Sequence, residues 1–258
     1  MNPDALAERY AFAVDLVLEA GALAMSMRQA LGVIEVKNPI DFCTEADRAV
    51  ESLIRNRLTA RFGDAVIGEE AGGASAEHVW VVDPIDGTTN YIHGTDRWCV
   101  SLAFVAGQRV EIGLIYAPSG DRLFAARRGQ GAFHNGRPMR VSNMAHGTAP
   151  VIETGWSPRR PIAGYGAMIA RFVDSGFEFR RDGSGALGMA DVALGRNDGY
   201  VELHINSWDV LAGLLLVQEA GGFVSDFLAG AGMMTGNPIV ACTPEISERL
   251  ITLFGIRV

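Results

Sequence analysis

The sequence predicts a protein of mixed α and β structure, built as two halves within one structural unit. Residues 4–145 combine two helical patterns with short strand patterns joined by tight turns, which is typical of an antiparallel α+β arrangement. After Pro150, strand and helix patterns alternate, which favours a second sheet covered by helices. The 258 residues lie near the upper size of a single core, and no long linker divides them. We therefore expect an N-terminal α+β half at 1–145 and a C-terminal α/β half at 146–258.

The N-terminal half begins with two predicted helices. Apolar side chains recur near helical spacing over residues 4–31, and this helix is expected to end near Gly32. A second helix is expected over 44–62, where Thr44 at the N-cap and Asp47 three residues later resemble a capping box. Strand patterns are expected at 34–36, 65–70, 79–82, 97–106, 110–116, 123–127 and 131–133, with a loop at 37–39.

The C-terminal half should alternate between strands and helices. A helix over 208–220, capped by Ser207, is expected to stop at Gly221–Gly222, because glycine readily adopts the conformation that ends a helix. The other expected helices are 163–175, 186–194 and 244–254, and the expected strands are 151–154, 177–180, 199–203, 223–226 and 239–241.

Composition and charge exclude several classes of function. With 48% hydrophobic and 20% charged residues, the chain is globular rather than disordered. The net charge is −8 and the arginine pairs are isolated, so we expect no nucleic-acid partner. The three cysteines lack CxxC spacing and indicate free thiols in a reducing compartment. No secretion-signal pattern is visible, and the apolar run at 211–217 is too short to span a bilayer. We therefore expect a cytoplasmic protein without a membrane partner.

The stretch Val79–Tyr91, VWVVDPIDGTTNY, carries the strongest functional pattern. Its apolar opening is typical of a strand buried on both faces. After that strand, Asp83 and Asp86 can present carboxylate oxygens to one side of a turn, and Gly87 lets the backbone approach a ligand closely. The two threonines that follow can begin a helix, whose first N–H groups lack internal partners and suit an anion. Carboxylates for a hard cation beside N–H groups for a phosphate indicate a metal-assisted phosphoryl site.

Three further acids lie where the predicted structure would expose them. Glu69 ends a strand-like run, while Asp209 and Asp47 each lie in the first turn of a helix. Ordinary roles are also open. Glu69 fits a surface loop, Asp209 fits a favourable contact with the helix dipole worth about 0.3–1 kcal/mol, and Asp47 fits a capping box. The residues alone do not decide between these roles.

Three separated segments resemble, in the same order, the signature segments of the inositol monophosphatase family, a group of lithium-sensitive, magnesium-dependent phosphomonoesterases. They are GEE at Gly68–Glu70, DPIDGTTNY at Asp83–Tyr91 and WDVLAG at Trp208–Gly213. Lys37–Asp47 is similar to a fourth family segment, with Cys43 in place of the usual valine. The resemblance covers nearly the whole chain. It implies a homodimer and the layered αβαβα sandwich of the inositol monophosphatase and fructose-1,6-bisphosphatase type.

The resemblance also implies two to three Mg²⁺ ions per active site, with Mn²⁺ as an alternative. It assigns the first ion to Glu69, Asp83 and the carbonyl of Ile85, the second to Asp83, Asp86 and Asp209, and a third, weaker ion to Glu69 and waters. The charges agree, because crowded carboxylates repel one another and a phosphate dianion until Mg²⁺ binds their oxygens at about 2.0–2.1 Å. Two ions about 3.5–4 Å apart can clamp a phosphoryl group, acidify a water and steady the leaving alkoxide.

The remaining roles follow from the same resemblance. The backbone N–H groups of Gly87 and Thr88 would contact the phosphate, and Thr88, oriented by Asp47, would help Glu69 to position the attacking water. No cysteine or histidine nucleophile is required. The implied substrate contacts are Asp86, Gly87, Thr88, Gly183, Ser184, Gly185, Glu202 and Asp209.

We therefore expect a phosphoric monoester hydrolase that acts on a small ester, with inositol monophosphate as the first candidate. Glu202 favours a polyol, because a carboxylate can accept hydrogen bonds from vicinal hydroxyls. Related enzymes act on histidinol phosphate, fructose 1,6-bisphosphate, NADP or a nucleotide 3′-phosphate, and Arg97–Cys99 departs from the usual sequence, so the ester stays open. Some family members act instead as regulatory partners of RNA polymerase or RNA. The negative net charge argues against direct RNA binding here.

Overall fold

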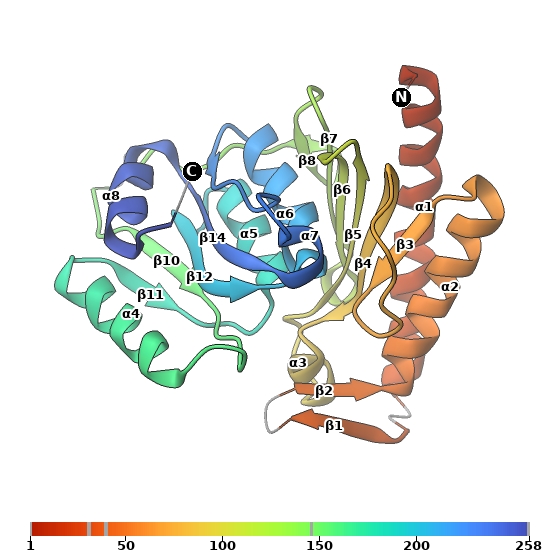
Figure 1. Ribbon diagram of the computed structural model, residues 1–258, viewed down its shortest axis with the longest axis horizontal. Helices are drawn as coiled ribbons and strands as arrows, with labels where there is room; N and C mark the ends of the chain where they lie inside the picture. Colours follow the sequence, from red (N-terminus) through yellow and green to blue (C-terminus); the bar gives the residue numbers. More distant parts are fainter. Residues whose placement is uncertain (1, 30–31, 39–40, 145–146, 257–258) are drawn as a thin grey trace.

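The protein forms five layers in the order helices, sheet, helices, sheet, helices, as the computed structural model shows (Figure 1). The structure describes residues 2–29, 32–38, 41–144 and 147–256. A seven-stranded and a five-stranded sheet face the same central helices, and a two-stranded hairpin lies apart from both. Three apolar clusters of the described residues fill the spaces between layers. The αβαβα sandwich expected from the sequence is therefore confirmed.

The first layer consists of α1 (Pro3–Arg28) and α2 (Glu45–Phe62), which cover the outer face of the seven-stranded sheet. Thr44 and Asp47 form the predicted capping box at the start of α2. α1 ends at Arg28, earlier than predicted. Four of its six buried residues are small, namely Ala13, Ala20, Gly21 and Ala24, and the other two are Leu16 and Val17. By length and composition alone α1 would also pass as a membrane span, the one such helix among the described residues, but here it packs against β5 and β6.

The second layer is the seven-stranded sheet, in which β3 to β9 lie in chain order. The strands are β3 (Ala65–Gly68), β4 (His78–Asp86), β5 (Cys99–Ala106), β6 (Arg109–Ala117), β7 (Arg122–Arg127), β8 (Ala132–His134) and β9 (Arg137–Pro138), with a 3₁₀ turn η1 (Pro118–Gly120). β3 and β4 are parallel, and the later pairs form the predicted antiparallel meander. Because Gly68 lies opposite Val82, the next residues along the two parallel strands, Glu69 just after β3 and Asp83 within β4, lie side by side.

The other three layers belong to the C-terminal half. The five-stranded sheet has the order β11-β10-β12-β14-β13. Its strands are β10 (Val151–Thr154), β11 (Glu178–Arg180), β12 (Gly199–Ile205), β13 (Phe223–Val224) and β14 (Asn237–Cys242). α5 (Gly185–Ala193) and α6 (Ser207–Glu219) lie between the sheets, while α4 (Ile162–Asp174) and α8 (Pro244–Phe254) cover the outer face. α6 is apolar because both sheets bury it, and it lies so close to β6 that a Cβ on Gly113 would lie 2.6 Å from the carbonyl of Ala212.

Some elements differ from the sequence prediction. The first strand of the hairpin, β1 (Ile34–Asn38), extends into the predicted loop at 37–39, and residues 39–40 lie outside the described residues. Its partner β2 (Asp41–Thr44) and the short helix α7 (Gly232–Thr235) were too short to show a periodic pattern. β4 runs through Asp86 because its pairing with β5 resumes there after an irregularity.

Two further boundaries concern the second half. The N-cap of α6 is Asn206 rather than Ser207, whose hydroxyl instead donates to the carbonyl of Met233 at 2.7 Å. The chain passes from the first sheet to the second between Pro138 and Val151, and the predicted division at 145/146 falls in this segment. Residues 145 and 146 themselves lie outside the described residues, so the division stays a prediction.

Candidate active site

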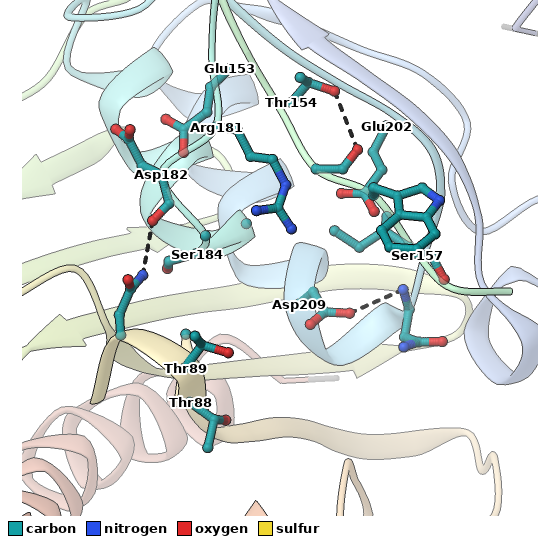
Figure 2. Close-up of a pocket in the computed structure, with 18 of the residues that line it drawn as sticks. Thr88, Thr89, Glu153, Thr154, Ser157, Arg181, Asp182, Ser184, Glu202 and Asp209 are labelled. Atoms are coloured by element: carbon teal, nitrogen blue, oxygen red, sulfur yellow. Dashed lines mark hydrogen bonds between the residues drawn. The ribbon is translucent and has the colours of Figure 1, made fainter. Parts of the chain in front are cut away.

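The predicted site residues come from distant parts of the chain and meet around one pocket of about 570 Å³. Both halves of the protein line this pocket (Figure 2). The predicted residues in its wall are Glu69, Gly87, Thr88, Gly183, Ser184, Gly185, Glu202 and Asp209. The others, Asp47, Asp83, Ile85 and Asp86, are buried.

Asp83, Asp86 and Asp209 form an acid cluster in which one carboxylate oxygen of each lies within 4.8 Å of the others. Burial, followed by the charges of Glu69 and Asp86, raises the pKa of Asp83 well above its ordinary value. Burial and the charges of Asp86 and Glu69 likewise raise the pKa of Asp209. Ionised carboxylates buried together repel one another unless a cation lies between them, so this set of oxygen donors fits a hard divalent metal.

Asp86 is held in place from α5. Its Oδ2 accepts hydrogen bonds from the Ser184 hydroxyl at 2.6 Å and the Ala186 N–H at 2.8 Å, and the Cys99 thiol lies 3.8 Å from the same oxygen. Burial raises the pKa of Asp86, whereas the bonds from Ser184 and Ala186 lower it. These donors converge on Oδ2, which leaves Oδ1 for another partner. The hydroxyl of Ser184, a predicted substrate contact, is therefore engaged with Asp86.

Glu69 lies in a tight turn that α2 holds in place. The turn at Gly68–Gly72 is closed by two backbone hydrogen bonds between its end residues, at 2.9 and 3.1 Å. Inside it, the buried carboxylate of Glu51 accepts from two backbone N–H groups at 2.8 and 3.0 Å. Arg55 pairs with Glu51 at 2.9 Å and donates to the Val66 and Gly72 carbonyls, both at 2.8 Å. Glu69 lies outside the 4.8 Å cluster, but its charge acts on two members of that cluster.

Asp47 and Thr88 lie in contact between α2 and α3 (Thr88–Ile92). The Thr88 hydroxyl is 3.3 Å from Asp47 Oδ1 and 3.0 Å from the Ile85 carbonyl, so one proton is shared between two acceptors. The other oxygen of Asp47 accepts from the N–H and the hydroxyl of Thr44 at 2.7 and 2.6 Å. Burial raises the pKa of Asp47, and the bonds from Thr44 lower it. Asp47 thus caps its helix and contacts Thr88 at the same time.

Gly87, the N-cap of α3, needs to be glycine for two reasons. Its φ of 95° is in the left-handed region, and a Cβ would lie 2.7 Å from the Arg97 carbonyl. The Asn90 side chain donates to the carbonyls of Arg97 and Asp182, both at 2.8 Å. α3, the loop after it and the loop before α5 are therefore joined, which places Gly183 beside Gly87.

Glu202 forms another wall of the pocket (Figure 2). It is 5% exposed and accepts a hydrogen bond from the Tyr200 hydroxyl at 2.7 Å. Burial raises the pKa of Glu202 to about 7, while Tyr200 and the charge of Arg181 lower it. Glu202 packs so closely on Gly155 that a Cβ there would lie 2.1 Å from its carboxylate oxygen. Its carboxylate is therefore held in one position.

Sequence analysis does not identify the ion network around Arg97. This guanidinium pairs with Glu153 at 2.8 Å and with Asp191, and lies 3.6 Å from Asp182. Asn197 donates to the same oxygen of Glu153 at 2.9 Å. The only sign of this network in the sequence was that Arg97–Cys99 departs from the usual family sequence. It could not reveal the partners, because they lie 56 and 94 residues away and no local pattern links them.

The chain matches the sequence model described as the inositol monophosphatase family over residues 5–257. It is 39% identical over 225 residues to inositol-1-monophosphatase of Mesorhizobium japonicum, covering 84% of each chain. It is 36% identical over 248 residues to Nus factor SuhB of Escherichia coli, covering 93% of this chain and 92% of that one. Among solved structures, the Thermotoga maritima IMPase superposes with a TM-score of 0.84 at 32% identity, over 96% of this chain and 97% of the other. The extragenic suppressor protein suhB from Bartonella henselae superposes with a TM-score of 0.83 at 36% identity, over 94% and 96%.

Proposed function

Because the chain belongs to the inositol monophosphatase family, we propose that it hydrolyses a small phosphate monoester in a magnesium-dependent reaction. Inositol monophosphate is the first candidate substrate. The proposal rests chiefly on one observation, the convergence of three carboxylates from β4 and α6 beside a pocket of suitable size. When its carboxylates are ionised, such a cluster destabilises the fold unless a cation neutralises it.

The chain supplies the ligands for this ion. Mg²⁺, or Mn²⁺ in its place, would be held by Glu69, Asp83, Asp86, Asp209 and the carbonyl of Ile85, as two to three ions. When bound, Mg²⁺ supplies positive charge that offsets the phosphate dianion and lowers the pKa of a water.

The protein's own groups position the reactants. The N–H groups of Gly87 and Thr88 bind the phosphate oxygens at the N-terminus of α3. The Thr88 hydroxyl, which contacts Asp47, orients the attacking water together with Glu69. Glu202 accepts hydrogen bonds from hydroxyls of the leaving group. The homodimer, which the resemblance implies, and the cytoplasmic location, which the cysteines and the lack of a secretion-signal pattern predict, both stay predictions.

Phosphate release from myo-inositol 1-phosphate, histidinol phosphate, fructose 1,6-bisphosphate and 3′-phosphoadenosine 5′-phosphate tests the proposal. We expect turnover that requires Mg²⁺ and is inhibited by lithium. Asp86→Asn and Asp209→Asn should each abolish turnover without loss of the circular dichroism spectrum, because each removes charge from a metal ligand. Near-normal rates in either variant would show that the second metal site is misassigned. If only histidinol phosphate is hydrolysed rapidly, the substrate assignment changes from inositol monophosphate to histidinol phosphate, and the proposed phosphate-ester hydrolysis still holds.

A second candidate function follows from the relatives named Nus factor SuhB. In that case the chain would act as a regulatory partner of RNA polymerase or RNA, with or without catalysis. Affinity capture with the wild type and with Asp209→Asn separates the two. Recovery of RNA polymerase with both proteins would support a non-catalytic role, and recovery with neither would leave hydrolysis as the function.

A further inference from the structure

Arg181 is a cation in the wall of the pocket that has no partner among the described residues. It follows β11 in the loop that leads into α5, and it is exposed. Figure 2 shows its side chain extending into the pocket between Ser184 and Glu202, toward Asp209. Among the described residues, its guanidinium makes no ion pair and no hydrogen bond. In a chain of net charge −8, a free guanidinium inside a cleft needs an explanation.

The neighbouring arginines are engaged, which sets Arg181 apart. The preceding residue, Arg180, donates to the Asn197 side chain at 3.2 Å. Arg97 binds the acids on the other side of the same loop, including Asp182 at 3.6 Å. Glu202, whose pKa the charge of Arg181 lowers, already accepts from Tyr200. The acids around Arg181 therefore have other partners, and its five donors remain available to a ligand.

We propose that Arg181 binds a second acidic group of the substrate, a carboxylate or a further phosphate, in addition to the phosphate that is removed. This inference rests on the proposed function, which assigns the reacting phosphate to the Gly87–Thr88 turn and the leaving group to the side of Glu202. Arg181 lies on that second side (Figure 2). A planar guanidinium fork matches the two oxygens of a carboxylate or phosphate.

The charges and the size of the pocket further restrict the class of ligand. Glu202 suits a hydroxyl donor and Arg181 suits an oxyanion, so the leaving group should carry both. A volume of about 570 Å³ leaves room for such a group beside the phosphate. The ligand class is thus a phosphorylated hydroxy acid or a polyol bisphosphate, and such an ester would replace inositol monophosphate, which has no second acidic group, as the first candidate substrate.

Two pairs of esters that differ by one acidic group test this. In the first pair, fructose 1,6-bisphosphate has one phosphate more than fructose 1-phosphate. In the second pair, 2-phosphoglycerate has a carboxylate that glycerol 2-phosphate lacks. The variants are Arg181→Gln and, as a matched control on the adjacent residue, Arg180→Gln. The measurement is the ratio of kcat/KM within each pair, with Mg²⁺ present.

We expect the wild type to have a higher kcat/KM for the doubly acidic ester of at least one pair. The pair in which this preference occurs shows whether Arg181 binds a phosphate or a carboxylate. Arg181→Gln should lower this preference by about 10- to 100-fold, mainly through KM, as expected for the loss of a charge-assisted hydrogen bond. Arg180→Gln should leave it within about twofold. An absence of preference in the wild type would overturn the proposal. So would an equal loss for both members of a pair, which would place Arg181 on the reacting phosphate.

A binding measurement keeps this test separate from the proposed reaction. If no ester is hydrolysed, the proposed function fails, and calorimetric titration of both ester pairs in Mg²⁺ then decides the role of Arg181. Tighter binding of the doubly acidic ester by the wild type but not by Arg181→Gln would support the subsite without the reaction. Equal affinities in both proteins would overturn it.

Discussion

Single side chains near the pocket serve two neighbours at once. Ser184 caps α5 by accepting the Leu187 N–H at 3.3 Å, and it donates to Asp86. Asp47 completes the capping box of α2 and also contacts Thr88. Helix capping and a contact with the Thr88 hydroxyl are both expected for Asp47, and the geometry shows that the two contacts coexist. A local explanation for a residue therefore does not exclude a role in the site.

Glu153 gives a prediction about pH. Burial raises the pKa of Glu153 from 4.5 to about 7, against the opposing effect of Arg97. Between these values the folded state binds the proton more tightly than the unfolded state, so the free energy of unfolding should fall as pH rises. The full contribution is about 3 kcal/mol. Urea unfolding of wild type and Glu153→Gln at pH 4.5 and 8, both with EDTA, measures it. The free energy of unfolding should fall less between the two pH values in Glu153→Gln than in the wild type. An equal fall in both proteins would show that Glu153 does not cause it.

At the scale of elements, prediction succeeds where a pattern is local. The capping box of α2, the meander from β5 to β8 and the apolar α6 were all visible in the sequence. The helical pattern of α1 was visible as well, but it did not identify the small residues at the centre of the buried face, because a pattern of large apolar residues misses alanine and glycine. β2 exists through pairing with β1 rather than through its own periodicity.

The turn after β3 yields a prediction for α2. Glu51→Ala should remove the acceptor for two backbone N–H groups and leave Arg55 unpaired, which costs about 3–5 kcal/mol for a buried ion pair. Because the turn carries Glu69, the Mg²⁺ concentration for half-maximal activity should also rise. Glu19→Ala is the matched control. Its pair with Arg57 is about half exposed at 2.9 Å, so its loss should change stability by less than about 1 kcal/mol. Equal effects of the two substitutions in urea unfolding would refute the role of Glu51.

At the scale of the molecule, the acid cluster joins the two halves. Asp83 and Asp86 belong to the first sheet, whereas Asp209 lies in the first turn of α6 in the second half. The signature segments predict these acids because each motif is local. They do not predict that Arg181 lacks a partner among the described residues or that Arg97 binds Glu153 and Asp191, since both facts depend on how the halves pack. The surroundings of the pocket are therefore less predictable than the acids of the cluster.

Divalent metal should stabilise the whole fold. At a Mg²⁺ concentration about 100 times the dissociation constant, binding adds about 2.7 kcal/mol to the free energy of unfolding. For a chain of this size the melting temperature should rise by about 5–10 °C. Without metal, Asp209→Asn should melt above the wild type, because it relieves repulsion, and with Mg²⁺ it should gain little. Differential scanning calorimetry in EDTA and in Mg²⁺ gives all four values. An equal wild-type melting temperature in EDTA and in Mg²⁺ would argue against the metal site.

The position of Asp209 on α6 also bears on synthesis of the protein. Asp83 and Asp86 leave the ribosome more than a hundred residues before the second half is complete, yet α6 must arrive before the inner face of the first sheet is covered. Until then the nascent chain exposes a sheet with an incomplete set of ligands, and solvent must hydrate its acids. An ion that required Asp209 would therefore bind late, and a chain truncated before α6 would lack both this acid and the cover for that sheet.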